Sequence, residues 1–334
     1  MKFLNLCAAR EIPKHMQDAL NEQPHRSGMY NWIFVHKGSI GTYWEYQNNL
    51  EDFDVIQVNC SPIDMTFVSE IRNKLQNSST KLVLNNDYVC EKWGKWVSQG
   101  TVNPYQYDSI QKMGDMVFGT EPHQVSNMIK GSFCMPHPTN TEMMKKVGSD
   151  YESDSIGFIY HWWAGETYLP HRTVEMAKKQ FKVASSRLYA YQPETDECLK
   201  WEKSMWDDKI GIQDFPTFAQ MIQGERIVYD PNPCHTYGRN GVELACFRKP
   251  VVGSNRVFSY NKLFPELTCD PYDVNATMKA FELGLGTSEK KEQMLDRAYE
   301  DVEFFNYKNS KTRWKEAFDI AIDRGGHEWY AKNG

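Results

Sequence analysis

Short apolar runs alternate with helical patterns along the chain, and this alternation limits the fold more than any other feature. It is typical of β-α-β units with parallel strands and argues against a β-sandwich. In the first half we predict strands at Phe3–Cys7, Trp32–His36, Asp54–Asn59, Lys81–Asn85, Asp115–Gly119 and Ser132–Met135.

A crossover helix is predicted at Met65–Leu75, between the third and fourth of these strands. Phe67, Val68, Ile71 and Leu75 are spaced by one, three and four, which puts them on one helical face. The polar stretch 145–154 then predicts a domain linker.

A second α/β series follows the linker. We predict helices at 173–181 and through most of 288–330, where Trp314, Phe318 and Ala321 form one apolar stripe. The strands predicted in this half are Ser155–Tyr160, Arg187–Tyr191, Lys209–Ile212, Arg226–Tyr229 and Pro250–Gly253.

The length of 334 residues exceeds what one hydrophobic core usually holds, so two domains are expected. We place the first domain at 1–150, the second at 151–310 and a C-terminal helix at 311–334 that packs toward the first domain. The predicted fold class is α/β, with two doubly wound Rossmann-like domains that face a central cleft. Open α/β sheets bind ligands at the carboxyl ends of their strands.

Composition excludes several classes of protein. No stretch approaches the roughly 20 apolar residues that cross a bilayer. Eight cysteines without a C-x-x-C pair argue against a disulfide framework and a zinc ribbon, so we expect a cytoplasmic protein, in the host cytoplasm if it is viral. A net charge of -6 gives no overall attraction to nucleic acid, although a local basic patch is compatible with it.

The most informative segment is 229–254, which is predicted to form strand, loop, helix, turn and strand. Its loop, Thr236-Tyr237-Gly238-Arg239-Asn240-Gly241, opens the helix. Backbone N–H groups and the positive end of the helix dipole at such a position bind phosphate well.

This segment resembles the C-terminal signature of the glycogen-synthase-like, group 1 glycosyltransferases, which have the GT-B fold. Tyr237-Gly238 matches the aromatic-Gly pair of the signature, Glu243 matches its second Glu, and the run 248–252 matches its return strand. His235 replaces the first Glu, eight positions before Glu243.

The resemblance implies roles for particular residues. The second Glu of the family holds the ribose hydroxyls of the donor nucleotide, so Glu243 inherits that role, and His171 or Arg172 lies where the family has a basic residue against the diphosphate. It implies that domain 1–150 binds the acceptor and that domain 151–310 binds the donor. It implies no cofactor and no metal site, with a nucleoside diphosphate sugar as co-substrate. The donor-binding residues that we predict are Glu243, Tyr237, Gly238, Arg239, Asn240, Arg172, His171 and Ile212. The predicted catalytic residues are His235, Asp87 and His15.

Acceptor recognition is assigned to the ends of the strands in the first domain. Aromatic residues interleaved with lysines can stack on sugars or unpaired bases, although burial of two Trp side chains against the sheet is an alternative. The predicted acceptor-binding residues are Arg10, His36, Lys37, Trp93, Lys95 and Trp96.

The predicted function is transfer of a hexosyl or pentosyl group from a UDP- or GDP-linked donor, with retention as the resemblance implies. The acceptor is a glycan hydroxyl or the hydroxymethyl group of a modified base in phage DNA. A sugar-nucleotide epimerase and a non-catalytic glycan-binding relic are the alternatives. No obligate protein partner is evident. Asp52-Phe53-Asp54 spells the D-x-D motif of metal-dependent glycosyltransferases, but it precedes a strand, which favours a turn.

Overall fold

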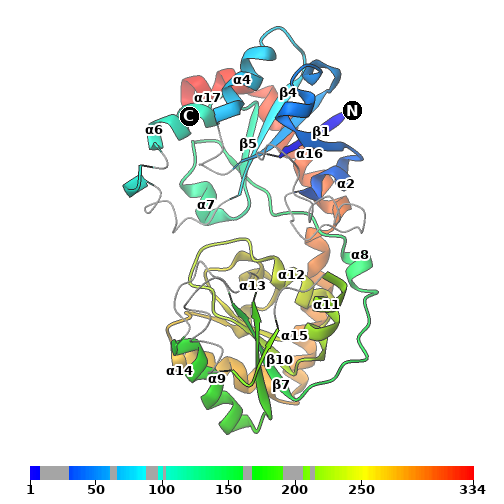
Figure 1. Ribbon diagram of the computed structural model, residues 1–334, viewed down its shortest axis with the longest axis vertical. Coiled ribbons are helices and arrows are strands. Elements are labelled where there is room, and N and C mark those ends of the chain that lie inside the picture. Colours follow the sequence, from blue (N-terminus) through cyan, green and yellow to red (C-terminus); the bar gives the residue numbers. More distant parts are fainter. Residues whose placement is uncertain are drawn as a thin grey trace. The chain divides into compact units, whose positions relative to one another are not determined.

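The computed structural model describes residues 1–7, 30–60, 66–87, 97–100, 103–160, 168–190, 206–210 and 215–334. The chain forms two compact units, each built on its own parallel sheet (Figure 1). The first unit comprises Met1–Asn140, His235–Tyr237 and Phe304–Gly334, and the second comprises Thr141–Cys234 and Gly238–Glu303.

The sheet of the first unit has the strand order β2-β1-β3-β4-β5-β6, and all pairs are parallel. Its strands are β1 (Phe3–Cys7), β2 (Ser39–Thr42), β3 (Val55–Cys60), β4 (Lys81–Asn86), β5 (Met116–Gly119) and β6 (Phe133–Cys134). The chain extends from β1 to β2 on one side and from β3 to β6 on the other. The sheet is therefore doubly wound, and its topological switch point lies between β1 and β3.

Helices cover both faces of this sheet because alternate residues of each strand are buried on opposite sides. Val68, Ile71 and Leu75 pack on one face, whereas Trp32 and Trp314 pack on the other. The helices of this unit are α2 (Trp32–His36), α3 (Tyr43–Tyr46), α4 (Thr66–Lys74), α6 (Pro104–Gln111), α7 (Pro122–Ser126), α16 (Tyr307–Asp323) and α17 (His327–Asn333), with a 3-10 turn η2 (Leu50–Asp52).

The segment Trp32–His36 was predicted as a strand, and that prediction is wrong because it forms the short helix α2. Four of its five side chains are buried, and α2 packs against α16 (Figure 1). A short apolar run that is buried all round has no periodicity that distinguishes helix from strand. The second strand in the sequence is instead Ser39–Thr42, an edge strand that the sequence analysis missed.

The sheet of the second unit has the order β12-β11-β10-β7-β8-β9, again all parallel. Its strands are β7 (Ser155–Tyr160), β8 (Ser185–Ala190), β9 (Asp208–Ile210), β10 (Ile227–Asp230), β11 (Val251–Ser254) and β12 (Thr268–Cys269). The chain extends from β7 to β9 on one side and from β10 to β12 on the other. The switch point of this second doubly wound sheet therefore lies between β7 and β10.

The helices of the second unit begin with the short α8 (Thr141–Met144). The others are α9 (Tyr168–Phe181), α11 (Phe215–Gly224), α12 (Arg239–Cys246), α13 (Phe258–Leu263), α14 (Val274–Leu285) and α15 (Glu289–Asp301), with 3-10 turns η3 (Pro265–Leu267) and η4 (Val302–Phe305). Helices α9 and α14 pack against each other, and Val174 and Phe281 are fully buried. Among the helices described, none is long and apolar enough to cross a membrane.

Candidate functional site

Two helices start just after the strands that flank the switch point of the second unit. β10 ends at Asp230 and leads through a loop to α12, while α9 is the helix that follows β7. Ligands of open α/β sheets bind at this position. The two segments that the sequence analysis assigned to the donor therefore border one switch point.

The start of α12 depends on glycine. Gly238 is the residue before the helix and has φ 73°, in the left-handed region. A Cβ atom there would lie 1.9 Å from Cγ1 of Val257, so a side chain has no room. Ser259 donates a hydrogen bond to the carbonyl of Gly238, and the helix has no side-chain N-cap.

A buried aromatic ring explains two further glycines in the signature. A Cβ atom on Gly241 would lie 2.8 Å from the ring of Tyr260, and one on Gly253 would lie 2.5 Å from it. The Tyr260 hydroxyl donates to Oδ2 of Asp230 over 2.5 Å. Asn240 also donates to this carboxylate, over 3.3 Å, so the Asn240 side chain that was predicted to bind the donor is engaged at the end of β10.

Glu243 is the central residue of this site. Its side chain is 1% exposed, and Oε1 accepts a hydrogen bond from Nε of Arg239 over 2.5 Å. Oε2 is buried and has no hydrogen-bond partner among the described residues. An unsatisfied buried polar group costs about 1–3 kcal/mol, so a ligand hydroxyl that donates to Oε2 would recover free energy.

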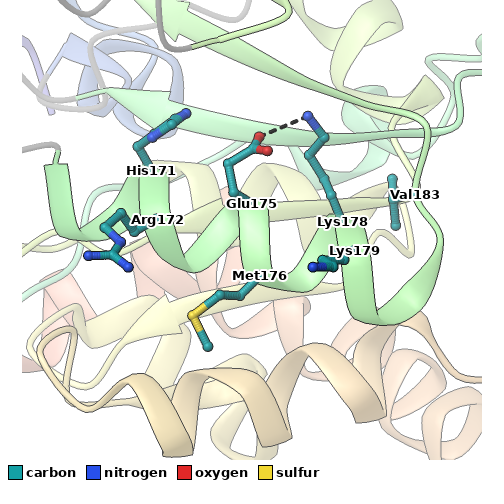
Figure 2. Close-up of a pocket in the computed structure, with 7 residues that line it drawn as sticks. All are labelled: His171, Arg172, Glu175, Met176, Lys178, Lys179 and Val183. Carbon is teal, nitrogen blue, oxygen red and sulfur yellow. Dashed lines mark hydrogen bonds and ion pairs between the residues drawn. The ribbon is translucent and has the colours of Figure 1, made fainter.

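Two further predicted donor residues, His171 and Arg172, lie near the start of α9. They line an open groove of about 630 Å³, in which His171, Glu175 and Lys178 project to one side of the helix and Arg172 and Met176 to the other (Figure 2). The ring of His171 meets Trp206 edge to face at 5.2 Å, and its buried Nε2 has no hydrogen-bond partner among the described residues. Arg172 is exposed.

The ammonium group of Lys178 is already neutralised. It pairs with Glu175 at 2.8 Å and with Asp207 at 2.5 Å. Burial lowers the pKa of Lys178, but its hydrogen bonds to Asp207 and Glu175 outweigh this effect and raise the pKa overall. Lys178 is therefore a weak candidate for binding a diphosphate on this helix.

In the first unit, buried amide side chains cross the switch point between β1 and β3. Asn59 donates to Oδ1 of Asn5 over 2.5 Å and accepts from Asn85 over 2.7 Å. Gln57 also donates to Asn59, over 3.3 Å, while its own Oε1 has no hydrogen-bond partner among the described residues. These buried amides form hydrogen bonds with one another, and they lie at the switch point, where open α/β sheets bind ligands.

Asp87, a predicted catalytic residue, follows β4 at the same edge of the sheet. Its Oδ2 lies 3.2 Å from Nε2 of His137, and the side chains are 32% and 5% exposed. The Tyr237 hydroxyl donates to the main-chain oxygen of His137 over 3.0 Å, and the two rings meet edge to face. Tyr237 is buried and belongs to the first unit, although we predicted it as a donor contact.

His235 also lies in the first unit. Its ring stacks on His123 with centroids 3.8 Å apart. The neighbouring Glu121 caps α7 by accepting from the backbone N–H groups of His123 and Gln124. Burial raises the pKa of Glu121, against the opposing effect of these hydrogen bonds and of the His123 and His235 rings.

Two predicted acceptor residues lie at the other edge of the sheet, and this is a correction. His36 and Lys37 come at the end of α2 and directly precede β2, so they are at the amino edge. His36 is 7% exposed, with its ring 4.3 Å from that of Phe3 and 4.4 Å from that of Trp314. The error follows from treating α2 as a strand, which would have placed both residues at the carboxyl edge.

Six predicted residues lie outside the described part of the chain, and nothing is concluded about them. They are Arg10, His15, Trp93, Lys95, Trp96 and Ile212. The sequence analysis also missed His137, because the Pro-His-Pro context indicates a chain connection and its partner Asp87 is 50 residues away. In the described residues, no three His, Cys, Asp or Glu side chains gather in a way that could hold a metal ion.

No protein-family model matches this chain, and no curated protein matches it either. Solved structures, in contrast, do match this chain. HepE from Anabaena in complex with UDP-glucose shares 11% identity over 96% of this chain and 100% of that chain, with a TM-score of 0.66. Sucrose-phosphate synthase from Thermosynechococcus elongatus shares 12% identity over 97% and 100%, with a TM-score of 0.61.

A TarM variant from S. aureus, in complex with fondaparinux, alpha-GlcNAc-glycerol and UDP, shares 10% identity over 83% of this chain, with a TM-score of 0.61. The chain spans 58% of the length of that TarM chain. Two doubly wound parallel sheets and these similarities decide the architecture. The chain has the GT-B fold. At such low identities the similarity shows the fold alone, and fold does not fix the reaction.

Proposed function

We propose that this GT-B protein is a glycosyltransferase that moves a sugar from a nucleoside diphosphate sugar to a hydroxyl acceptor. The observation that carries the proposal is Oε2 of Glu243, buried beside the switch point of the second unit without a hydrogen-bond partner among the described residues. A ribose with adjacent hydroxyls supplies the donor that this oxygen lacks. Glu243 is also the residue to which the glycosyltransferase signature assigns the ribose.

The remaining parts of a donor site lie on the same two helices. The uncapped start of α12 offers backbone N–H groups and the positive end of its dipole to a diphosphate. His171 and Arg172 on α9 supply cationic or hydrogen-bonding side chains. Stabilising the departing diphosphate is a main task of the reaction, and these groups are proposed to do it without a metal.

The base of the donor is proposed as uracil. HepE was solved with UDP-glucose and the TarM variant with UDP, and GDP-linked donors are the competing outcome. Retention of the anomeric configuration is proposed on the glycosyltransferase signature. The acceptor is proposed to bind at the carboxyl edge of the first unit, where Asp87 and His137 can orient a hydroxyl group.

A panel assay tests the proposal. The protein is incubated with UDP-glucose, UDP-GlcNAc and GDP-mannose, each with oligosaccharides or with hydroxymethylated DNA, and the products are analysed by mass spectrometry. A sugar added to an acceptor supports transfer and identifies the acceptor class. A donor that is isomerised without an acceptor indicates the epimerase alternative, and no binding of any nucleotide sugar by calorimetry contradicts the proposal.

A further inference from the structure

Arg313, on α16 of the first unit, is a half-buried cation without an acidic partner. Its guanidinium lies 3.9 Å from the ring centroid of Phe304, and one N–H group donates to Oγ of Ser310 over 3.1 Å. No carboxylate of the described residues forms an ion pair with it. An arginine has five N–H donors, so most of those on Arg313 have no acceptor within the described part of the chain.

Two other arginines of the protein, in contrast, each form an ion pair with a glutamate. Arg187 pairs with the buried Glu225 at 3.1 Å, and Arg297 pairs with Glu266 at 2.5 Å. Burial lowers the pKa of Arg187, but the charge and hydrogen bond of Glu225, together with Tyr151 and Tyr189, outweigh this effect and raise the pKa overall. The pKa of Arg313 is lowered, because burial is not offset by the smaller opposing effects of Tyr237, Cys134 and Glu316.

The position of Arg313 connects it with the acceptor half of the site. α16 starts at the carboxyl edge of the sheet, where Asn306 bridges to Thr139, and it ends at the amino edge, where His327 contacts Asp115 before β5. Arg313 is in the second turn, where its guanidinium lies over Phe304, whose ring meets that of Phe305. The ring of Phe305 contacts that of Tyr237, which donates to the main-chain oxygen of His137, the partner of Asp87.

We infer that Arg313 is an anion-binding residue that holds a phosphate or carboxylate group of the acceptor. The inference rests on the proposed function for the identity of the ligand, because it places an acceptor at this edge of the sheet. A guanidinium presents paired N–H donors that match both anions, and the Phe304 ring fixes its plane. The acceptor is accordingly an anionic molecule whose reacting hydroxyl lies toward Asp87.

The test observes the arginine directly. In protein labelled with nitrogen-15 arginine, the Nε–H signal of Arg313 is assigned by its loss in Arg313→Met. Titration with inorganic phosphate, and separately with acetate, should shift this signal in the wild type. The anion that binds with the higher affinity in these titrations identifies the anionic group. A signal that moves with neither anion overturns the inference.

Arg324 provides the matched control, because it lies at the opposite end of α16 and also approaches aromatic rings, those of Phe133 and Trp329. Phosphate affinity, measured by calorimetry because the Arg313 variants lack the signal, should fall at least tenfold in Arg313→Met, fall less in Arg313→Lys and stay unchanged in Arg324→Met. Equal losses in the Arg313 and Arg324 variants would mean a general charge effect and overturn the assignment.

A separate titration with UDP keeps this inference apart from the proposed function. UDP reports on the second unit, and its affinity should be the same in Arg313→Met and the wild type. Phosphate binding that depends on Arg313, in a protein that binds no UDP, would contradict the proposed function and support the anion site. UDP binding in a protein whose Arg313 signal shifts with neither anion would support the proposed function and overturn the anion site.

Discussion

Nε of Arg239 donates a hydrogen bond to Oε1 of Glu243, one helical turn further along α12. The pair fixes the orientation of the carboxylate and leaves Oε2 without a hydrogen-bond partner among the described residues. Because both side chains are on the same helix, this geometry is local and does not depend on distant parts of the chain. It makes Glu243 a preorganised acceptor for hydroxyl groups.

The first prediction is that Glu243 distinguishes ribose from deoxyribose. A hydrogen bond to a charged group contributes about 1.5–3 kcal/mol, so the wild type should bind UDP roughly ten- to a hundredfold more tightly than 2′-deoxy-UDP. In Glu243→Gln this ratio should fall toward one. Calorimetry on the four combinations gives the coupling, and Glu282→Gln, an exposed substitution on α14, is the control. An unchanged ratio in Glu243→Gln would remove the residue from the donor site.

The second prediction concerns Asp87 and His137, whose side chains are 3.2 Å apart. Asp87→Asn should lower turnover about a hundredfold, the usual scale for a positioned acid–base group, while UDP affinity stays the same. Turnover in Asp87→Asn combined with His137→Asn should be little lower than in either single variant, because the pair acts as a unit. Asp108→Asn, exposed on α6, is the matched control. Additive losses would indicate that the two residues act separately.

Much of the fold could be predicted from the sequence, because strands and helices with strong periodicity carry their own signal. Strand β3 and helix α4 were predicted to within a residue or two. The helix Trp32–His36 was not, because all but one of its side chains are buried and the aromatic and β-branched residues favour a strand. That single error placed His36 and Lys37 at the wrong edge of the sheet.

The candidate site divides in the same way. Glu243 and Gly238 were predicted from the resemblance of their segment to the glycosyltransferase signature, and both belong to one local turn and helix. Their roles stay predictions. The Asp87–His137 pair and the contact between Tyr237 and Phe305, which lies beside the Phe304 ring under Arg313, could not be found, because each joins residues that are far apart in the chain. Only the order of the strands brings the ends of β4 and β6 and the start of α16 to one edge.

The third prediction is a pH dependence of stability that arises from His36. Burial and, to a smaller extent, the charge of Lys311 together lower the pKa of His36 to about 3. The unfolded chain, in which the pKa is near 6.5, binds the proton that the folded protein excludes, so stability is complete above pH 6.5 and is lost as the pH falls toward 3.

The loss approaches about 1.4 kcal/mol per pH unit within this window. His36→Phe keeps an aromatic ring against Phe3 and Trp314 and has no proton to bind. Its unfolding free energy, measured by denaturant titration at pH 7 and pH 5, should fall less than that of the wild type. Equal falls in the two proteins would show that His36 does not control the acid response.

The fourth prediction is that activity survives an excess of EDTA. We assign stabilisation of the diphosphate to the start of α12 and to His171 or Arg172. The D-x-D residues Asp52 and Asp54 precede β3 and so lie at the amino edge of the first sheet, where Oδ2 of Asp54 accepts from the backbone N–H of Lys2 over 2.6 Å. Turnover that is lost with EDTA and restored by Mn²⁺ would contradict this assignment.

The last prediction separates the two acceptor classes through the dependence of acceptor affinity on salt. DNA binding releases about 0.9 counterion per phosphate contact, so a DNA acceptor should give a steep slope that Lys95→Ala makes shallower by about one unit. A glycan with a single anionic group should give a shallow slope, and Trp93→Ala or Trp96→Ala should then dominate through lost stacking. Lys95, Trp93 and Trp96 lie outside the described residues, so these roles stay predictions from the sequence.

Lys37→Ala is the control for this experiment, because Lys37 is exposed at the amino edge of the sheet, directly before β2. It removes one positive charge, as Lys95→Ala does, but at the edge away from Asp87. Affinity for the acceptor is measured at several salt concentrations for the wild type and the four variants, with UDP affinity as the reference for folding. If Lys37→Ala changes the slope as much as Lys95→Ala, the acceptor is held by overall charge and not at the carboxyl edge of the first unit.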